Sequence, residues 1–174
     1  MSANMESEVT LEEMLDAREK RAERQREYLK KNAGSVLCFM LNIPGPVKVS
    51  KEIEKVFTEG IERIQRQLKE SYIPFVEYEI VRAKTGYEYY LGAECDPETL
   101  KQMMVEVEEN GKLARLFDID VFRKNGEKID RQQIGRAPRK CLICEEDAHV
   151  CARNRTHSVD EMMKYIQKII KQEL

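Results

Sequence analysis

Residues 36–42 form a continuous apolar run, Val-Leu-Cys-Phe-Met-Leu-Asn, without the alternation of a half-exposed strand. Apolar side chains on both sides of a strand indicate a central place in a sheet whose two faces are both covered. The sequence Ile43-Pro44-Gly45-Pro46 then breaks the run, because proline cannot donate to a strand ladder. The fold must therefore provide packing on each side of this strand.

The remaining helices and strands are predicted from the spacing of apolar residues. Ser50 can cap the second helix, Asp96-Pro97 opens the third, and a capping box at 158–161 opens the last. Lys84-Thr85-Gly86 predicts a hairpin turn, and 32–34 (Asn-Ala-Gly) ends the first helix. The predicted helices are 6–31, 50–68, 96–110 and 158–170, and the further strands are 73–83, 87–94 and 115–122, with a short partner at 128–130.

In chain order these elements are strand, helix, strand, strand, helix, strand, with one helix before them. A ferredoxin-like (split βαβ) antiparallel sheet requires this order, so the predicted fold class is α+β. We expect one domain, because 174 residues suffice for one core and are short for two. It would comprise an N-terminal helix (1–32), the α+β core (35–130), and a basic, Cys-containing loop with a C-terminal helix (131–174).

The first predicted helix carries polar side chains within its apolar stripe. Arg18 and Gln25 fall in the middle of this stripe. Polar groups on an inward face need partners, so these two side chains are either satisfied structurally or directed into a cleft. The apolar members of the stripe are Leu11, Met14, Leu15, Ala22 and Leu29.

Composition restricts the environment of the protein. No apolar run approaches the ~20 residues needed to cross a membrane, and residues 1–10 lack the features of a signal peptide. We therefore expect a cytoplasmic protein. Five cysteines, an odd number, do not resemble a secreted disulfide framework and indicate reduced thiols or a metal site. Charged residues make up 36% of the chain but the net charge is -2, so charge is informative only locally.

Two aspartates alternate with apolar residues in the segment 115–122 (RLFDIDVF). In an extended strand Asp118 and Asp120 share one face, and their Cα atoms lie about 7 Å apart. Short carboxylates at this separation can converge on one divalent cation, and magnesium held in this way usually serves substrate phosphates. The same pattern fits a strand with one solvent-exposed face, so spacing alone leaves both interpretations open.

A cluster of positive side chains follows, in a segment where Gly135 and Pro138 favour a loop. The planar guanidinium of arginine suits phosphate oxygens, so this loop could clamp a polyphosphate beside a magnesium site. Solvated surface charge is the alternative for each residue taken singly. The cluster consists of Arg131, Arg136, Arg139, Lys140, Arg153 and Arg155.

Three cysteines and a histidine in this segment have the spacing C-x2-C-x6-C-x5-H, which permits a tetrahedral zinc site of three thiolates and one imidazole. His149 competes for the fourth position, and plain packed or exposed thiols are the alternative. The histidine also precedes a helix N-terminus, where a phosphate could dock. The four residues are Cys141, Cys144, Cys151 and His157.

Five separated sequence motifs, which include the aspartate pair and the basic segment, point to a known family. They are 114–121 (ARLFDIDV), 136–144 (RAPRKCLIC), 150–153 (VCAR) with 156–157 (TH), 18–21 (REKR) and 42–48 (NIPGPVK). Together they resemble the citrate lyase holo-acyl-carrier-protein synthase family, the apo-citrate lyase phosphoribosyl-dephospho-CoA transferases. The combination is far more specific than any single motif.

The resemblance implies a nucleotidyl transfer in which triphosphoribosyl-dephospho-CoA donates phosphoribosyl-dephospho-CoA to a serine of the acyl carrier subunit of citrate lyase. Pyrophosphate leaves, and the nucleophile arrives on the partner protein. The work of the enzyme would then be positioning and charge neutralisation. The Gly-Ser loop usual among nucleotidyltransferases is not evident after the first strand, so we do not expect a polymerase-β-type fold.

The resemblance also implies roles for single residues. Asp118 and Asp120 would hold Mg²⁺, and Arg136 and Arg139 would act in catalysis. Candidates for a general base are Glu77, Glu79 and Asp130, and candidates for carrier recognition are Lys48, Arg63 and Arg66. The expected substrate-binding residues are Arg18, Arg21, Gln25, Lys48, Arg115, Lys140, Arg153 and His157.

A second hypothesis belongs to another class: a non-catalytic zinc module that binds a partner through the basic C-terminal segment. The transferase would require magnesium, whereas the module would hold stoichiometric zinc and function without magnesium. Nucleic acid is not an expected partner, because the chain is slightly acidic overall and the basic stretch has no interleaved aromatic residues for base stacking. Neither hypothesis involves a membrane.

Overall fold

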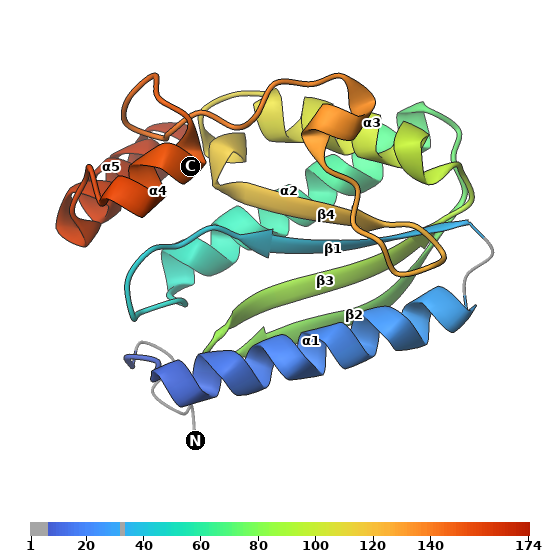
Figure 1. The fold of residues 1–174 in the computed structure, drawn as a ribbon, viewed down its shortest axis with the longest axis horizontal. Helices are drawn as coiled ribbons and strands as arrows, with labels where there is room; N and C mark the ends of the chain where they lie inside the picture. Colours follow the sequence, from blue (N-terminus) through green and yellow to red (C-terminus); the bar gives the residue numbers. More distant parts are fainter. Residues whose placement is uncertain (1–6, 32–33) are drawn as a thin grey trace.

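The computed structural model describes residues 7–31 and 34–174, which form an α+β structure around one four-stranded antiparallel sheet (Figure 1). The strand order is β2-β3-β1-β4. Two 3-10 turns, η1 (Leu113–Leu116) and η2 (Arg131–Ile134), lie before and after β4. The other elements are α1 (Leu11–Lys31), β1 (Ser35–Leu41), α2 (Lys51–Glu70), β2 (Phe75–Ala83), β3 (Gly86–Ala93), α3 (Pro97–Glu109), β4 (Phe117–Phe122), α4 (Ala148–Asn154) and α5 (Val159–Glu173).

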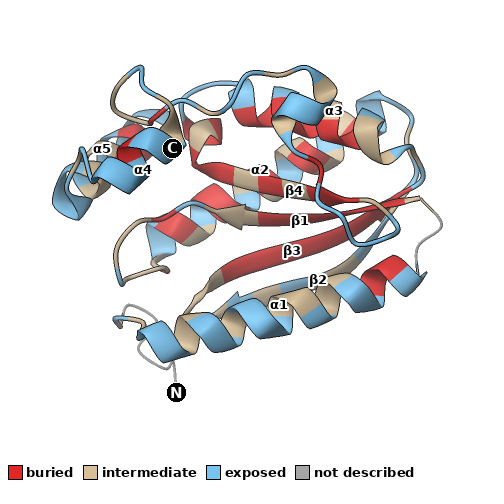
Figure 2. Cartoon of the chain, viewed as in Figure 1, coloured by how far each residue is buried: buried red, intermediate tan, exposed pale blue. Residues whose placement is uncertain are grey.

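Strand β1 lies inside the sheet, as its apolar run predicts. It pairs with β3 on one side and with β4 on the other. Helices α2 and α3 cover one face of the sheet and α1 lies across the other, so the central strands are buried on both sides (Figures 1 and 2). Leu37 and Phe39 enter the core under α2 and α3, whereas Val36 and Cys38 pack with Tyr28 of α1. We call the second side the α1 face.

The orientation of α1 differs from the prediction. Leu11 and Leu15 are 77% and 50% exposed, and Arg18 is also exposed, so the inward placement of these three residues is wrong. The other members of the predicted stripe do face inward: Leu29 is buried, and Met14 and Ala22 are half-buried. Gln25 is half-buried. The helix starts later than predicted, because Thr10 and Glu13 form reciprocal side chain–backbone hydrogen bonds of 2.8 and 3.2 Å that fix its first turn. Residue 6, the predicted start of this helix, lies outside the described residues. So do residues 32 and 33 of the 32–34 sequence that was predicted to end it.

Ion pairs, together with the buried Tyr28 and Leu29 near the end of the helix, orient α1 on the sheet. Arg21 Nε lies 3.0 Å from Glu88, which is only 5% exposed, and Arg24 Nε lies 3.3 Å from Glu79. The Tyr28 hydroxyl donates to the same Glu79 carboxylate. Because Glu79 and Glu88 belong to β2 and β3, the helix turns its arginines toward the sheet, and Arg21 compensates the buried negative charge of Glu88.

The outer edge of β4 is closed by groups from neighbouring segments. The Ile119 N–H donates to Glu108 at 2.9 Å, and Lys101 donates to the Ile119 carbonyl at 3.0 Å. The Ile129 N–H donates to the Val121 carbonyl at 3.0 Å, which places the predicted 128–130 partner beside the strand as a short bridge. An occupied edge cannot pair with another strand. The side chains of β4 on the α1 face, rather than its backbone edge, are therefore the groups available to bind a ligand.

No helix in residues 7–31 and 34–174 is both long enough and apolar enough to cross a membrane.

Candidate active site

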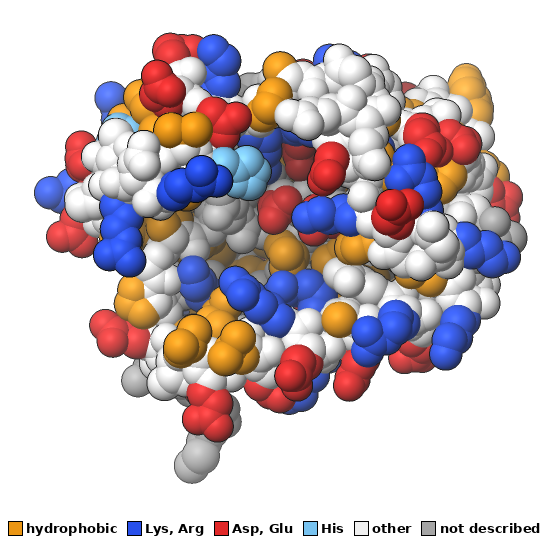
Figure 3. Space-filling model, in the orientation of Figure 1, with side chains coloured by type: hydrophobic (Ala, Val, Ile, Leu, Met, Phe, Trp, Pro, Cys, Tyr) orange, Lys and Arg blue, Asp and Glu red, His pale blue; other side chains and the backbone are white. Residues whose placement is uncertain are grey.

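Asp118 and Asp120 project from β4 on the α1 face, opposite Met40 and Cys38 of β1. Both line a cavity of about 1190 Å³ between the edge of the sheet and the C-terminal segment. The space-filling view shows this hollow with acidic side chains inside it and basic side chains near its rim (Figure 3). A volume of this size accommodates a nucleotide-sized ligand.

The two carboxylates repel each other in a partly desolvated place. Burial, followed by the charge of Asp118, raises the pKa of Asp120 from 3.8 to about 6. Lys128 Nζ lies 3.6 Å from Asp120 Oδ1 and offsets part of this repulsion, but its side chain is half exposed. A pair of neighbouring carboxylates with an elevated pKa is a site that a cation would stabilise.

Further charge surrounds the aspartates on the α1 face. Burial raises the pKa of the Cys38 thiol, and the nearby negative charges of Glu88 and Asp120 raise it further. Glu88 is compensated by Arg21 and by the Tyr90 hydroxyl, which donates to its second oxygen. Arg21 is therefore engaged with a buried carboxylate of the sheet at the margin of the aspartate pair.

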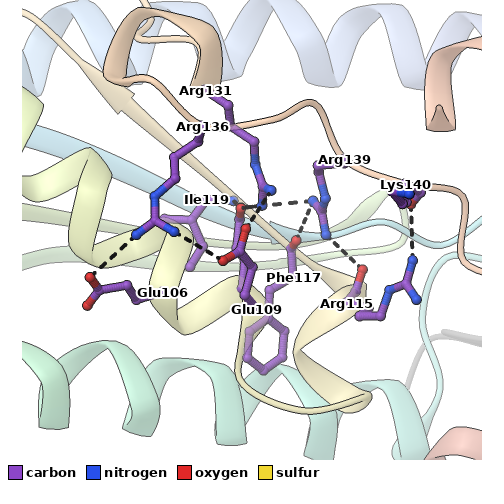
Figure 4. Close-up of polar contacts among 10 residues, drawn as sticks. Glu106, Glu109, Arg115, Phe117, Ile119, Arg131, Arg136, Arg139 and Lys140 are labelled. Carbon is purple, nitrogen blue, oxygen red and sulfur yellow. Dashed lines mark hydrogen bonds and ion pairs between the residues drawn. The ribbon is translucent and has the colours of Figure 1, made fainter.

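Arg115 and Arg139 form a reciprocal clamp between β4 and the basic segment (Figure 4). Arg139 donates to the carbonyls of Phe117 at 2.7 Å and Arg115 at 2.8 Å. Arg115 in turn donates to the carbonyls of Lys140 at 3.1 Å and Cys141 at 2.7 Å. The Arg139 fork thus holds the residue that directly precedes Asp118, and the two arginines fix the wall of the cavity.

Arg136 lies apart from this clamp. Its guanidinium forms ion pairs with Glu106 at 3.6 Å and Glu109 at 3.5 Å on α3 (Figure 4). Arg131 also binds α3, where it donates to the buried Glu108. Both arginines thus bind carboxylates of α3. Arg131 still lines the cavity that holds the aspartates, whereas Arg136 does not.

The other predicted binding residues are divided between the cavity and the rest of the surface. Arg115, Arg139, Lys140 and His157 line the cavity. Lys48 donates at 2.6 Å to the carbonyl of Ile43, within the turn that follows β1. The predicted residues outside the cavity lining are Arg18, Arg21, Gln25, Lys48, Arg136 and Arg153.

The candidate general bases are also separated by the fold. Asp130 lies in the cavity wall, where its backbone N–H donates to the Gln133 side chain at 2.9 Å at the start of η2. Glu77 accepts hydrogen bonds from Tyr89 at 2.9 Å and from Gln65 at 2.7 Å, away from the aspartates. Glu79 is bound to α1, as described above.

The described residues bring Cys141, Cys144, Cys151 and His157 together, with their ligand atoms all within 4.8 Å of one another. Three of them also line the cavity. The cluster lies in a segment that contains α4, a seven-residue helix that the sequence did not predict. Asp147 caps this helix by accepting from the His149 N–H at 2.8 Å, and so short a helix shows no clear apolar period.

Comparison with known proteins gives a direct assignment. The sequence profile of the apo-citrate lyase phosphoribosyl-dephospho-CoA transferase family matches residues 9–173. The chain belongs to this transferase family. The resemblance predicted from the five motifs is confirmed.

Individual proteins that are similar to this chain carry names that agree with the family assignment. A probable apo-citrate lyase phosphoribosyl-dephospho-CoA transferase of Streptococcus pyogenes serotype M3 is 40% identical over 167 residues, covering 93% of this chain and 85% of that protein. A Vibrio cholerae protein with the same name is 32% identical over 170 residues, covering 97% and 96%. Protein CitXG of Haemophilus influenzae is 37% identical over 163 residues, or 94% of this chain, which spans only 35% of that longer protein.

Several charged residues around this transferase site were missed by sequence reasoning. Glu88, Lys101 and Glu108 are 4–6% exposed and hold α1, α3 and β4 in place, and Lys128 pairs with Asp120. The alternation of Glu88 with Tyr87 and Tyr89 was a usable signal, since it places one carboxylate on the face opposite two aromatic side chains. Lys101 and Glu108 gave none, because the backbone groups of Ile119 and the Arg131 guanidinium that bind them carry no sequence pattern linking them to α3.

Proposed function

We propose that this chain transfers the phosphoribosyl-dephospho-CoA group from triphosphoribosyl-dephospho-CoA to a serine of the apo acyl carrier subunit of citrate lyase. The family assignment names the reaction, and the observation that carries it to this site is the Asp118–Asp120 pair within a nucleotide-sized cavity. The order of elements, with β1 and β3 at the centre of an antiparallel sheet, supports a ferredoxin-like core for this enzyme.

The proposed step is a substitution at phosphorus. The serine oxygen forms a bond to the α-phosphorus of the triphosphate, and the bond from that phosphorus to the bridging oxygen of the β-phosphate breaks. The serine proton passes to solvent, pyrophosphate leaves with the electrons of the broken bond, and a phosphodiester remains on the carrier. No covalent intermediate on this chain is required, so the protein acts by positioning and charge stabilisation.

The donor set fits a magnesium ion. Asp118 and Asp120 offer hard oxygen ligands on one face of a strand. Burial and the charge of Asp118 both raise the pKa of Asp120, and a divalent cation would stabilise its ionised form. We propose that these two carboxylates hold Mg²⁺. When bound, the ion would supply positive charge to the phosphate oxygens of the substrate.

Exposed cations complete the proposed phosphate site. Lys128, Lys140 and Arg155 are exposed and line the same cavity. Lys140 lies 3.4 Å from Glu145, which is itself 93% exposed on its side chain, so this surface pair can be exchanged for a phosphate at small cost. Arg115 and Arg139 are largely committed to backbone carbonyls, and we assign them to positioning the wall that presents Lys140.

Pyrophosphate release tests this proposal. The protein is incubated with the precursor, magnesium and the apo carrier, and with a carrier whose acceptor serine is replaced by alanine. We expect release only with the native carrier. Equal release with both carriers would show hydrolysis rather than transfer and would contradict the proposal.

Magnesium should stabilise the folded protein in a pH-dependent manner. Because folding raises the pKa of Asp120, its protonated form favours the folded state, and this stability is lost as the pH rises from 3.8 through about 6. At neutral pH, Asp120→Asn should therefore raise the free energy of unfolding by about 1–3 kcal/mol in the absence of magnesium. Urea unfolding with and without Mg²⁺ measures both effects.

Two comparisons control this result. Magnesium should stabilise the native protein at neutral pH and lose its effect well below the Asp120 pKa, and it should not stabilise Asp120→Asn. A variant destabilised at neutral pH, or one stabilised by magnesium as much as the native chain, would remove Asp120 from the proposed metal site.

A further inference from the structure

The basic segment has almost no apolar core of its own. Between residues 131 and 158 the only side chains classed as buried are Cys141 and Cys151. The segment nevertheless makes a defined set of turns. The Cys141 N–H donates to the backbone carbonyl of Glu146 at 2.7 Å, and the Ala148 N–H donates to the backbone carbonyl of Arg139 at 2.9 Å. A chain that buries so little apolar surface needs another source of folding free energy.

Its two buried cysteines meet two further ligand-type side chains. Cys144 Sγ lies 3.4 Å from Cys151 Sγ and 3.4 Å from His157 Nε2, and all four ligand atoms, including Cys141 Sγ, fall within 4.8 Å of one another. Tetrahedral zinc with the usual bond lengths separates its sulfur ligands by about 3.8 Å and a sulfur from a nitrogen by about 3.5 Å. All five cysteines are free thiols, so the cluster is not a disulfide.

We infer that Cys141, Cys144, Cys151 and His157 bind one zinc ion and that this ion organises the wall of the transfer cavity. The three thiolates and one imidazole come from the 141–144 turn, from α4 and from the linker before α5. His149, the competing histidine, is exposed and lies outside the cluster.

Zinc fits this donor set better than other common ions. Thiolate ligands disfavour magnesium and calcium, which bind oxygen. Four protein ligands also fill a tetrahedral shell and leave no open position for substrate or water, so the ion has a structural role. The chemistry of the transfer would remain at the aspartates.

The zinc site is coupled to the cavity through the backbone. The carbonyl of Cys141, a proposed ligand, accepts from Arg115 at 2.7 Å, and Lys140 directly precedes it. Arg139, one residue earlier, binds the carbonyl of Phe117 next to Asp118. Loss of the ion should therefore loosen Lys140 and the Arg115–Arg139 clamp while the sheet and its aspartates stay folded.

Metal content of the purified full chain tests the site directly and does not depend on transfer activity. We expect about one zinc per chain by elemental analysis of protein prepared without chelator. Cobalt(II) added to the metal-depleted protein should give the intense visible absorption of tetrahedral thiolate coordination. Cys144→Ser should lose the bound zinc and the cobalt spectrum, whereas Cys95→Ser, a half-buried cysteine outside the cluster, should retain both.

His157 provides a sharper pair of variants. His157→Ala should weaken zinc binding, and His157→Cys should restore it as a four-thiolate site, with transfer activity following the metal. Hydrogen exchange should show that zinc removal increases exchange in residues 135–158 and leaves β1 and β4 protected. A chain with reduced thiols that binds no zinc and gives no cobalt spectrum, or exchange that is unchanged by zinc removal, would overturn the inference.

Discussion

Asp118→Asn and Asp120→Asn are each expected to reduce carrier modification by at least about 1000-fold, or about 4 kcal/mol of transition-state stabilisation. Asparagine keeps the shape of each side chain and removes the negative charge that would hold the metal. The substitution also removes repulsion between the two carboxylates, so the fold should persist. Steady-state modification rates at saturating magnesium measure the loss.

Asp16→Asn is the matched control for this pair. Asp16 is an exposed aspartate of α1 that pairs with Lys20 at 2.7 Å on the helix surface. Its removal should change the rate by less than about twofold, because an exposed ion pair contributes little. Near-native activity in a folded Asp118 or Asp120 variant would exclude that residue from the metal site.

The second large effect is expected at Arg139, whose guanidinium joins two carbonyls of the η1–β4 junction. Arg139→Lys keeps the positive charge but cannot donate to both Phe117 and Arg115 in the same geometry. We expect a loss of about 1–3 kcal/mol in unfolding free energy and at least a tenfold lower modification rate. Urea unfolding and steady-state kinetics measure the two losses.

The lysine variant separates two roles for this residue. If Arg139 acted chiefly as a phosphate-binding charge, lysine would preserve most of the rate and the stability. Arg26→Lys, at an exposed position of α1, should change neither quantity. A native rate in Arg139→Lys would contradict the positioning role assigned here.

Much of the sheet could be predicted because its signals are local. The unbroken apolar run at 36–42 indicated a strand covered on both faces, and β1 is central and buried. The caps at Ser50, Asp96 and Ser158 correctly marked the starts of three helices, since each cap is satisfied by a backbone N–H within three residues. The order of elements then restricted the topology.

The rotation of α1 could not be predicted in the same way. Its inward face is set by Glu79 and Glu88, which lie more than fifty residues away in sequence and attract Arg24 and Arg21. Apolar periodicity assumes that a helix packs on an apolar surface. That assumption holds near the end of the helix, where Tyr28 and Leu29 are buried, and fails earlier along it, where Arg21 pairs with the buried Glu88.

The candidate site was predictable to a similar degree. Alternation placed Asp118 and Asp120 on one face of a strand, which the structure confirms, and the C-x2-C-x6-C-x5-H spacing grouped four side chains that do lie together. Sequence could not show that Arg136 is drawn to α3 or that Arg139 binds backbone carbonyls. A basic loop offers several partners for each arginine, and only the folded arrangement selects one.

Intact mass spectrometry of the carrier subunit tests the central claim most directly. The native chain, incubated with apo carrier, triphosphoribosyl-dephospho-CoA and magnesium, should increase the mass of the carrier by one phosphoribosyl-dephospho-CoA group, and Asp120→Asn should leave the carrier unmodified. A carrier of unchanged mass after incubation with folded, zinc-loaded native protein would contradict the account.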